Sequence, residues 1–234
     1  MTNNNLETAV LSSSNEICKD NKKTECCIKA IIFDLGNVVI PYDLQKSIEW
    51  MRKIIFFKKV KDDDIENAVS PKKMELIRKY QKGMPRKEFF NEIEKRSKIP
   101  FAKNFSMLAE QTTYAMFSDM NPEMERLIKG LKGNYPLAVL SNITEPHKEF
   151  VLQKYPLREL FDYLFFSCEV GMRKPEKEIF YFALDKMNVK PEEAVFIDDY
   201  KRNVDAAKEI GINALLFNST PELKSKFYEL GICP

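Results

Sequence analysis

Side chains capable of chemistry follow the short apolar runs of this 234-residue sequence. Asp34 comes directly after the run Ile-Ile-Phe and is followed by Leu-Gly-Asn. A buried carboxylate costs several kcal/mol unless a partner compensates its charge. Asp34 therefore either marks a turn or stands at an edge where chemistry takes place.

Other polar residues occupy the same position after later apolar runs. They are Ser141 and Asn142, Lys174, and the acidic pair Asp198 and Asp199. Doubly wound parallel sheets bind ligands at the carboxyl ends of their strands. We therefore expect these residues and Asp34 to converge on one rim of a sheet.

These residue types suit phosphoryl transfer from an aspartate. A carboxylate such as Asp34 can attack phosphorus and form an acyl phosphate, which splits one difficult displacement into two. Because the attack brings an anion against an anionic phosphate, the site needs the Lys174 ammonium and a Mg²⁺ ion held by carboxylates. Ser141 and Asn142, with Lys174, form the expected phosphate-binding group. Alternatively, Ser141 and Asn142 only cap the next helix.

The pattern of the chain predicts the elements that would position these residues. Apolar runs alternate with amphipathic stretches, which indicates a doubly wound, Rossmann-like α/β fold with a parallel sheet. The runs predicted as strands are 28–33, 137–140, 163–167, 194–197 and 214–217. Asn121 before Pro122, and Thr220 before Pro221, predict helix starts.

The interval 41–120 breaks this alternation, since it holds several helical patterns and no run typical of a strand. Helical segments are expected around residues 44–55 and from Pro71, Pro85 and Asn104 onward. We therefore predict an inserted all-helical cap over 41–120, and an α/β core formed by 28–40 and 121–234. The polar segment 1–27 reads as a disordered tail.

Composition excludes several classes of function. The formal charge of +2 gives no case for a nucleic-acid partner, and no apolar run approaches the roughly 20 residues of a membrane helix. The N-terminal segment lacks the pattern of a signal peptide, so a cytoplasmic protein is expected. The five cysteines show no metal-ligand spacing, there is one histidine, and reduced thiols are expected rather than a zinc site.

Four motifs in order give the sequence a resemblance to a known family. They are FDLGNV at 33–38, LSN at 140–142, KP at 174–175 and FIDDYKRNVDAA at 196–207. The chain resembles the haloacid dehalogenase-like hydrolase superfamily, and within it the sugar-phosphatase-like branch that carries a helical cap after the first motif. The resemblance extends over residues 28–234.

The resemblance implies a role for each matching position. Asp34 would be the nucleophile and a magnesium ligand, together with the backbone carbonyl of Gly36 and the carboxylate of Asp199. Asp198 would support the metal through water or hydrogen bonds, and Asn203 would order the loop that carries the acidic pair.

Gly36 departs from the family pattern, in which a second Asp at this position protonates the leaving group and later activates water. General acid–base help is worth about 10²–10⁴-fold. Asp43 and His147 are candidates for a substitute proton donor or a substrate contact. For His147 the alternative is a helix-surface or capping residue.

These features predict a Mg²⁺-dependent hydrolase that removes phosphate from a small phosphorylated metabolite, with sugar phosphates among the candidates, through an aspartyl-phosphate on Asp34. One alternative is a metal-independent haloacid dehalogenase, which would use the same nucleophile without an acidic pair. Another is a catalytically weakened protein that binds a ligand or partner, because Gly36 replaces the expected acid.

Overall fold

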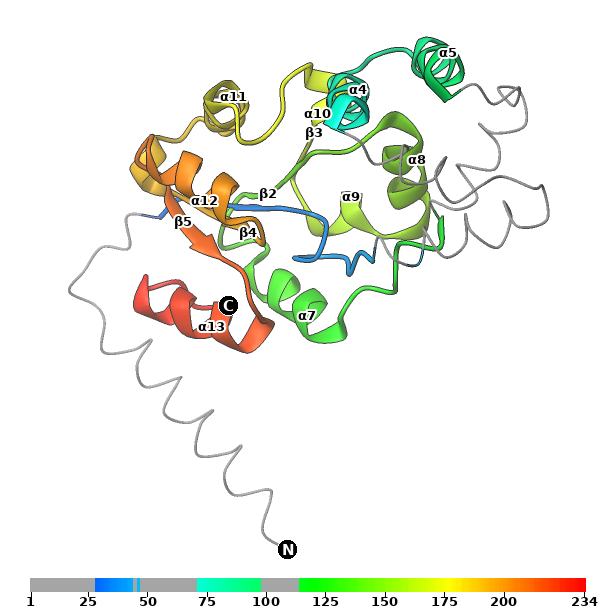
Figure 1. The fold of residues 1–234 in the computed structure, drawn as a ribbon. Coiled ribbons are helices and arrows are strands. Elements are labelled where there is room, and N and C mark those ends of the chain that lie inside the picture. Colours follow the sequence, from blue (N-terminus) through cyan, green and yellow to red (C-terminus); the bar gives the residue numbers. More distant parts are fainter. Residues whose placement is uncertain (1–27, 44–45, 47–70, 98–113) are drawn as a thin grey trace, which may run out of the picture.

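The computed structural model describes residues 28–43, 46, 71–97 and 114–234 (Figure 1). Five parallel strands form one sheet in the order β3-β2-β1-β4-β5. The strands are β1 (Ala30–Phe33), β2 (Leu137–Ser141), β3 (Tyr163–Phe166), β4 (Ala194–Asp198) and β5 (Asn213–Leu216). The predicted doubly wound α/β fold is confirmed, and each predicted strand is present with its ends shifted by at most two residues.

The register of the sheet places the predicted site residues at one edge. Phe33 pairs with Val139 of β2 on one side and with Ile197 of β4 on the other. The backbone N–H of Asp34 then donates to the carbonyl of Ile197 at 2.8 Å. The carboxyl ends of these central strands therefore meet, as expected for parallel neighbours.

Helices cover both faces of the sheet, and alternate strand residues face different helices (Figure 1). Ile31 and Phe33 pack in one core with α7 (Pro122–Leu131), α8 (Glu145–Lys154), α9 (Leu157–Leu160) and α13 (Thr220–Glu229). Ala30 and Ile32 pack in a second core with α11 (Lys177–Met187) and α12 (Lys201–Lys208). Burial on both faces explains why the central strands are continuously apolar.

The predicted helix starts are found with one shift. Asn121 caps α7, since its side chain accepts a hydrogen bond from the N–H of Glu123, and Pro122 opens the helix. The cap of α13 is Ser219 rather than Thr220, because the Ser219 hydroxyl accepts from the N–H of Glu222 at 3.4 Å. Two short helices, α10 (Ser167–Val170) and η2 (Pro191–Glu193), complete the core.

Two helices are described within the interval 41–120. They are α4 (Pro71–Gln81) and α5 (Arg86–Ser97), close to the starts expected at Pro71 and Pro85. Leu76, Tyr80 and Phe89 form a small apolar cluster between them, with the Tyr80 and Phe89 rings stacked at 4.1 Å. The expected tail 1–27, the helical pattern of 44–55 and the helix from Asn104 lie outside the described residues.

The two connections between the core and this inserted segment run side by side. Tyr42 and Phe117 form an antiparallel bridge, the N–H of Asp43 donates to Met116 at 2.9 Å, and that of Ser118 donates to Pro41 at 3.1 Å. Extended backbone therefore occurs in an interval where the sequence indicated only helices. The division into core and cap at residues 41 and 120 remains a prediction.

The expectation that the cysteines are reduced thiols is wrong for one of them. Cys233 is disulfide-bonded, whereas Cys168 is a free, partly buried thiol. In the parts of the chain that the structure describes, no helix has the length and apolar character needed to span a membrane.

Shortening Phe33 to Ala should destabilise the protein by about 3–5 kcal/mol, because it leaves a cavity in the first core. Phe33 is fully buried, and its ring makes edge contacts with Phe161 at 5.9 Å and Phe227 at 6.5 Å. Urea unfolding measures the change. Tyr181→Ala, at a ring that is 52% exposed, is the control and should cost less than about 0.5 kcal/mol. A Phe33→Ala loss as small as the control's would contradict the packing described here.

Candidate active site

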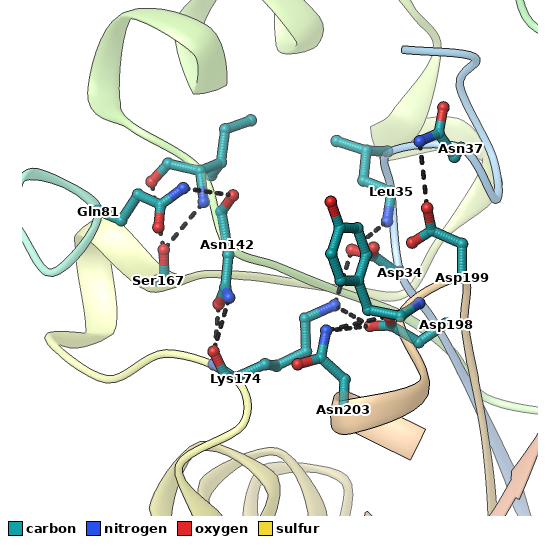
Figure 2. A network of polar contacts seen from close by, with 12 residues as sticks. Asp34, Leu35, Asn37, Gln81, Asn142, Ser167, Lys174, Asp198, Asp199 and Asn203 are labelled. Atoms are coloured by element: carbon teal, nitrogen blue, oxygen red, sulfur yellow. Dashed lines mark hydrogen bonds and ion pairs between the residues drawn. The ribbon is translucent and has the colours of Figure 1, made fainter. Parts of the chain in front are cut away.

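Asp34 lies at the centre of the polar cluster formed at the strand ends (Figure 2). Its Oδ1 atom is 2.7 Å from Nζ of Lys174 and accepts a hydrogen bond of 2.7 Å from the N–H of Leu35. The residue is 9% exposed, so its carboxylate is mostly shielded from water but still accessible. The carboxylate is thus fixed by two donors on one oxygen.

Lys174 joins two carboxylates in the interior of the protein. Its Nζ atom is 2.7 Å from Asp34 and 2.6 Å from Oδ2 of Asp198, and the residue is only 1% exposed. Burial alone would lower the pKa of Lys174, but the two carboxylates outweigh this and hold it above its usual value. The ammonium is therefore charged at neutral pH.

Asp198 is completely buried and surrounded by donors. Besides Lys174, the side-chain amide of Asn203 donates to both of its oxygens at 3.0 Å, and the N–H of Tyr200 donates to Oδ1 at 2.8 Å. Asn203 lies one turn into α12, so these bonds tie the loop after β4 to the start of that helix. The loop-ordering role expected of Asn203 remains a prediction.

Asp199 is half-buried and is oriented by Asn37, a residue that the sequence analysis did not single out. The Asn37 side chain donates to Oδ2 of Asp199 at 3.1 Å and accepts from the N–H of Tyr42 at 2.9 Å. Asn37 has a φ of 58°, a left-handed conformation that Asn tolerates better than most residues. An Asn directly after Gly36 was the signal for such a turn.

One carboxylate oxygen from each of Asp34, Asp198 and Asp199 lies within 4.8 Å of the other two. Three carboxylates face one ammonium, so the cluster carries an excess of negative charge. Burial is the main reason why the pKa of Asp34 rises to about 7; Asp198 adds to the rise and Lys174 opposes it. Such a set of hard oxygen donors fits a divalent cation such as Mg²⁺.

The residues after β2 hold Lys174 in place. Ser141 is buried at the end of β2. The side chain of Asn142 donates to the carbonyl of Lys174 at 2.8 Å and accepts from its N–H, also at 2.8 Å (Figure 2). The Asn142 side chain is therefore engaged with protein backbone, and its expected contact with phosphate remains a prediction.

Two further residues near this loop were missed by the sequence analysis. Ser167 holds the backbone of Ile143, accepting from its N–H at 2.9 Å and donating to its carbonyl at 3.2 Å. Gln81, at the end of α4, donates to the carbonyl of Asn142 at 3.4 Å. Nothing in the sequence distinguishes either residue from an ordinary polar position.

Asp43 and His147 are not members of the carboxylate cluster. His147 lies in α8 with its ring edge-on to Phe117 at 5.9 Å, and burial lowers its pKa to about 4. It is therefore neutral at pH 7 and lacks the imidazolium proton of an efficient general acid. Asp43 lies in the first connection to the inserted segment, where its N–H bonds to Met116. The proposed proton or substrate roles of both residues remain predictions.

Comparison with models of known protein families identifies the family of this chain. The family model of haloacid dehalogenase-like hydrolases matches residues 28–211. The chain belongs to this family. The matched interval contains every cluster residue, from Asp34 to Asn203.

The haloacid dehalogenase-like chain has relatives with different activities. D-ribitol-5-phosphate phosphatase of Bacteroides thetaiotaomicron is 29% identical over 202 residues, covering 79% of this chain and 89% of that protein. Drimenol cyclase drtB of Aspergillus calidoustus is 27% identical over 201 residues, which are 84% of this chain but 35% of that protein. The chain thus spans about a third of the cyclase, but most of the phosphatase.

Solved structures of this family share the fold. A HAD family enzyme from Bacteroides thetaiotaomicron in its magnesium complex superposes with a TM-score of 0.72 at 25% identity, covering 86% of this chain and 98% of that one. The same enzyme in complex with magnesium and inorganic phosphate gives a TM-score of 0.67 at 25% identity, covering 82% and 94%.

Replacing Asp34 with Asn should remove a pH-dependent loss of stability when divalent metal is chelated. The pKa of Asp34 is raised from 3.8 to about 7, so between these values the folded state holds a proton that the unfolded state has released. The wild type therefore loses up to about 4 kcal/mol as the pH rises from about 4 to 7, and Asp34→Asn lacks this loss.

Urea unfolding in EDTA at several pH values measures this difference. Asp205→Asn is the matched control, since Asp205 is an exposed carboxylate paired with Lys201, and its pH profile should follow the wild type. Parallel profiles for Asp34→Asn and the wild type would show that Asp34 does not titrate as described.

Proposed function

We propose that the chain is a Mg²⁺-dependent phosphatase that acts on a small phosphorylated metabolite through an aspartyl-phosphate on Asp34. The observation that carries the proposal is the Asp34 carboxylate, fixed 2.7 Å from a buried ammonium and clustered with two further carboxylates. The similarity to D-ribitol-5-phosphate phosphatase over most of both chains supports it.

The described contacts of Asp34 suggest which oxygen reacts. The donors from Leu35 and Lys174 both reach Oδ1, so we assign the attack on phosphorus to Oδ2. The P–O bond to the leaving group breaks as the new bond forms, and the phosphoryl group is carried by Asp34. Water then attacks this acyl phosphate, releases inorganic phosphate and regenerates the carboxylate.

Lys174 would stabilise the charge that gathers at the phosphoryl oxygens. Because it is buried, its charge acts in a medium of low dielectric and interacts more strongly than an exposed lysine. The hydroxyl of Ser141, which lies at the end of the neighbouring strand β2, would donate to the same oxygens. Asn142 would serve this step by holding the Lys174 backbone.

The donor set also assigns residues to the metal. The carboxylates of Asp34 and Asp199, with the carbonyl of Gly36, would hold Mg²⁺, and Asp198 would support it from its network with Lys174 and Asn203. Bound there, the ion would supply positive charge against the phosphate dianion.

The substrate class that we propose is a phosphorylated sugar or polyol. The support is the relative named for ribitol 5-phosphate. Because Gly36 supplies no acid, phosphate esters with acidic leaving groups, such as anomeric sugar phosphates, should react fastest.

Asp34→Asn should abolish phosphate release, because an amide is too poor a nucleophile to form the acyl phosphate. The assay is a screen of phosphorylated sugars, polyols and p-nitrophenyl phosphate with Mg²⁺, and the expected loss is at least about 10³-fold. Chelation of the metal should abolish the wild-type activity as well. Phosphate release that equals the Asp34→Asn background would refute the phosphatase, and metal-independent hydrolysis of a haloacid would favour the dehalogenase.

Gly36→Asp should restore a general acid and raise kcat for alkyl phosphates by about tenfold or more. A Cβ atom at Gly36 would have Cβ of Tyr42 as its nearest neighbour at 3.9 Å, which is ordinary contact. Gly36→Asn is the matched control, because it has the same size but no acidic proton. The ratio of kcat for an alkyl phosphate to kcat for p-nitrophenyl phosphate should rise only in the Asp variant. An equal rise in both variants would argue against proton donation.

A further inference from the structure

Gln81, the last residue of α4, contacts two parts of the core that flank Lys174. Its Nε2 atom donates to the carbonyl of Asn142 at 3.4 Å. Its Oε1 atom accepts from Nε and Nη2 of Arg173 at 3.3 and 3.2 Å. One side-chain amide from the inserted segment thus joins the loop after β2 to the loop after α10.

Both partners of Gln81 are connected to the Lys174 backbone. Arg173 precedes Lys174 in the chain, and the side chain of Asn142 bonds to both its N–H and its carbonyl (Figure 2). The ammonium of Lys174 in turn lies 2.7 Å from the candidate nucleophile Asp34. A shift of Gln81 would therefore reach Lys174 through two short routes.

The contact with Arg173 has a specific electrostatic reason. Arg173 is 9% exposed, and burial, Arg202 and Arg78 lower the pKa of its guanidinium. Glu176 opposes this lowering only in part. In the described ranges no carboxylate lies within ion-pair distance of this guanidinium, and the acceptor it uses is Oε1 of Gln81. A buried cation needs such an acceptor, so the position of Gln81 matters to the Arg173 loop.

Two neighbours of Gln81 show that the end of α4 lies tightly against the core. Nζ of Lys82 is 3.0 Å from a carboxylate oxygen of Glu176. Gly83 has a φ of +91°, and a Cβ atom there would stand 2.8 Å from the carbonyl oxygen of Cys168. The chain reversal after α4 therefore requires glycine both for its conformation and for its close approach to α10.

We propose that Gln81 is a positioning residue, which makes the placement of Lys174 depend on the docking of α4 onto the core. The effect of Gln81 on the catalytic rate rests on the proposed phosphatase function. A docked α4 holds Asn142 and Arg173, and these hold the backbone from which the Lys174 ammonium reaches Asp34. Gln81 does not touch the reacting atoms.

The kinetic test compares Gln81→Ala with Gln81→Glu, using p-nitrophenyl phosphate and Mg²⁺. Gln81→Ala should lower kcat about 10- to 100-fold and change KM less than about threefold, because Lys174 is misplaced after binding. Alanine favours helix more than glutamine does, so a weakened α4 helix cannot account for this loss. Gln81→Glu keeps the acceptor for Arg173 but loses the N–H that donates to Asn142, so its kcat should lie between those of the wild type and Gln81→Ala.

Lys79→Ala is the matched control on the same helix, since Lys79 is exposed and paired with Glu75. It should leave kcat and KM at their wild-type values. An equal loss in Lys79→Ala and Gln81→Ala would mean that α4 acts only through general stability. A rise in KM alone for Gln81→Ala would mean that Gln81 binds substrate. Either result overturns the proposal.

Backbone hydrogen exchange tests the docking without any substrate. Peptides covering residues 78–84 and 171–176 should exchange about fivefold faster or more in Gln81→Ala, and at wild-type rates in Lys79→Ala. Unchanged exchange at 171–176 in Gln81→Ala refutes the coupling. A wild type that releases no phosphate would instead refute the proposed function, while the exchange rates would still decide the role of Gln81.

Discussion

The ion pairs of the buried Lys174 ammonium are the interaction on which the rest of the site depends. The ammonium lies between Asp34 and Asp198, at 2.7 and 2.6 Å, in a region almost closed to water. Removing one partner of such a buried pair typically costs about 3–5 kcal/mol, because the other charge is left without compensation. The surrounding amides follow from this constraint: Asn142 fixes the backbone of the lysine, and Asn203 saturates the oxygens of Asp198.

The carboxylate cluster has an excess of acidic groups. This excess affects both the stability of the protein and the chemistry that the site can support. Three carboxyl groups, those of Asp34, Asp198 and Asp199, share one ammonium, and burial together with the neighbouring Asp198 raises the pKa of Asp34. A divalent cation would cancel the remaining excess. The same clustering of carboxylates that destabilises the protein without a metal therefore favours the binding of a metal and, next to it, of an anionic phosphate.

The fold could be predicted from the sequence because buried parallel strands leave a simple pattern. Strands covered on both faces are continuously apolar, so their ends are easily located, and Asp34, Lys174 and Asp198 could be placed at one rim on that basis. The same argument did not foresee that the Asn142 side chain bonds to the Lys174 backbone.

The residues that could not be predicted act through contacts between distant segments. Gln81 is a polar residue on an amphipathic helix, where most such residues face water. Its role follows only from where α4 lies against Arg173. Asn37 directly follows a glycine, which is a local signal for a turn, yet its bond to Asp199 requires the register of β1 against β4. No local pattern encodes such a register.

The central place of β1 in the sheet has a consequence for folding. Ile31 pairs with Leu137 on one side and with Val195 on the other, so both neighbours of this strand come from remote parts of the chain. Such non-local pairing gives a high contact order and slow folding. Asp34 follows β1 directly, whereas Asp198 is the last residue of β4 and Lys174 lies in the loop between α10 and α11. The ion pairs of Asp34 are therefore complete only when these segments have come together around β1, so incompletely folded chains should lack the candidate active site.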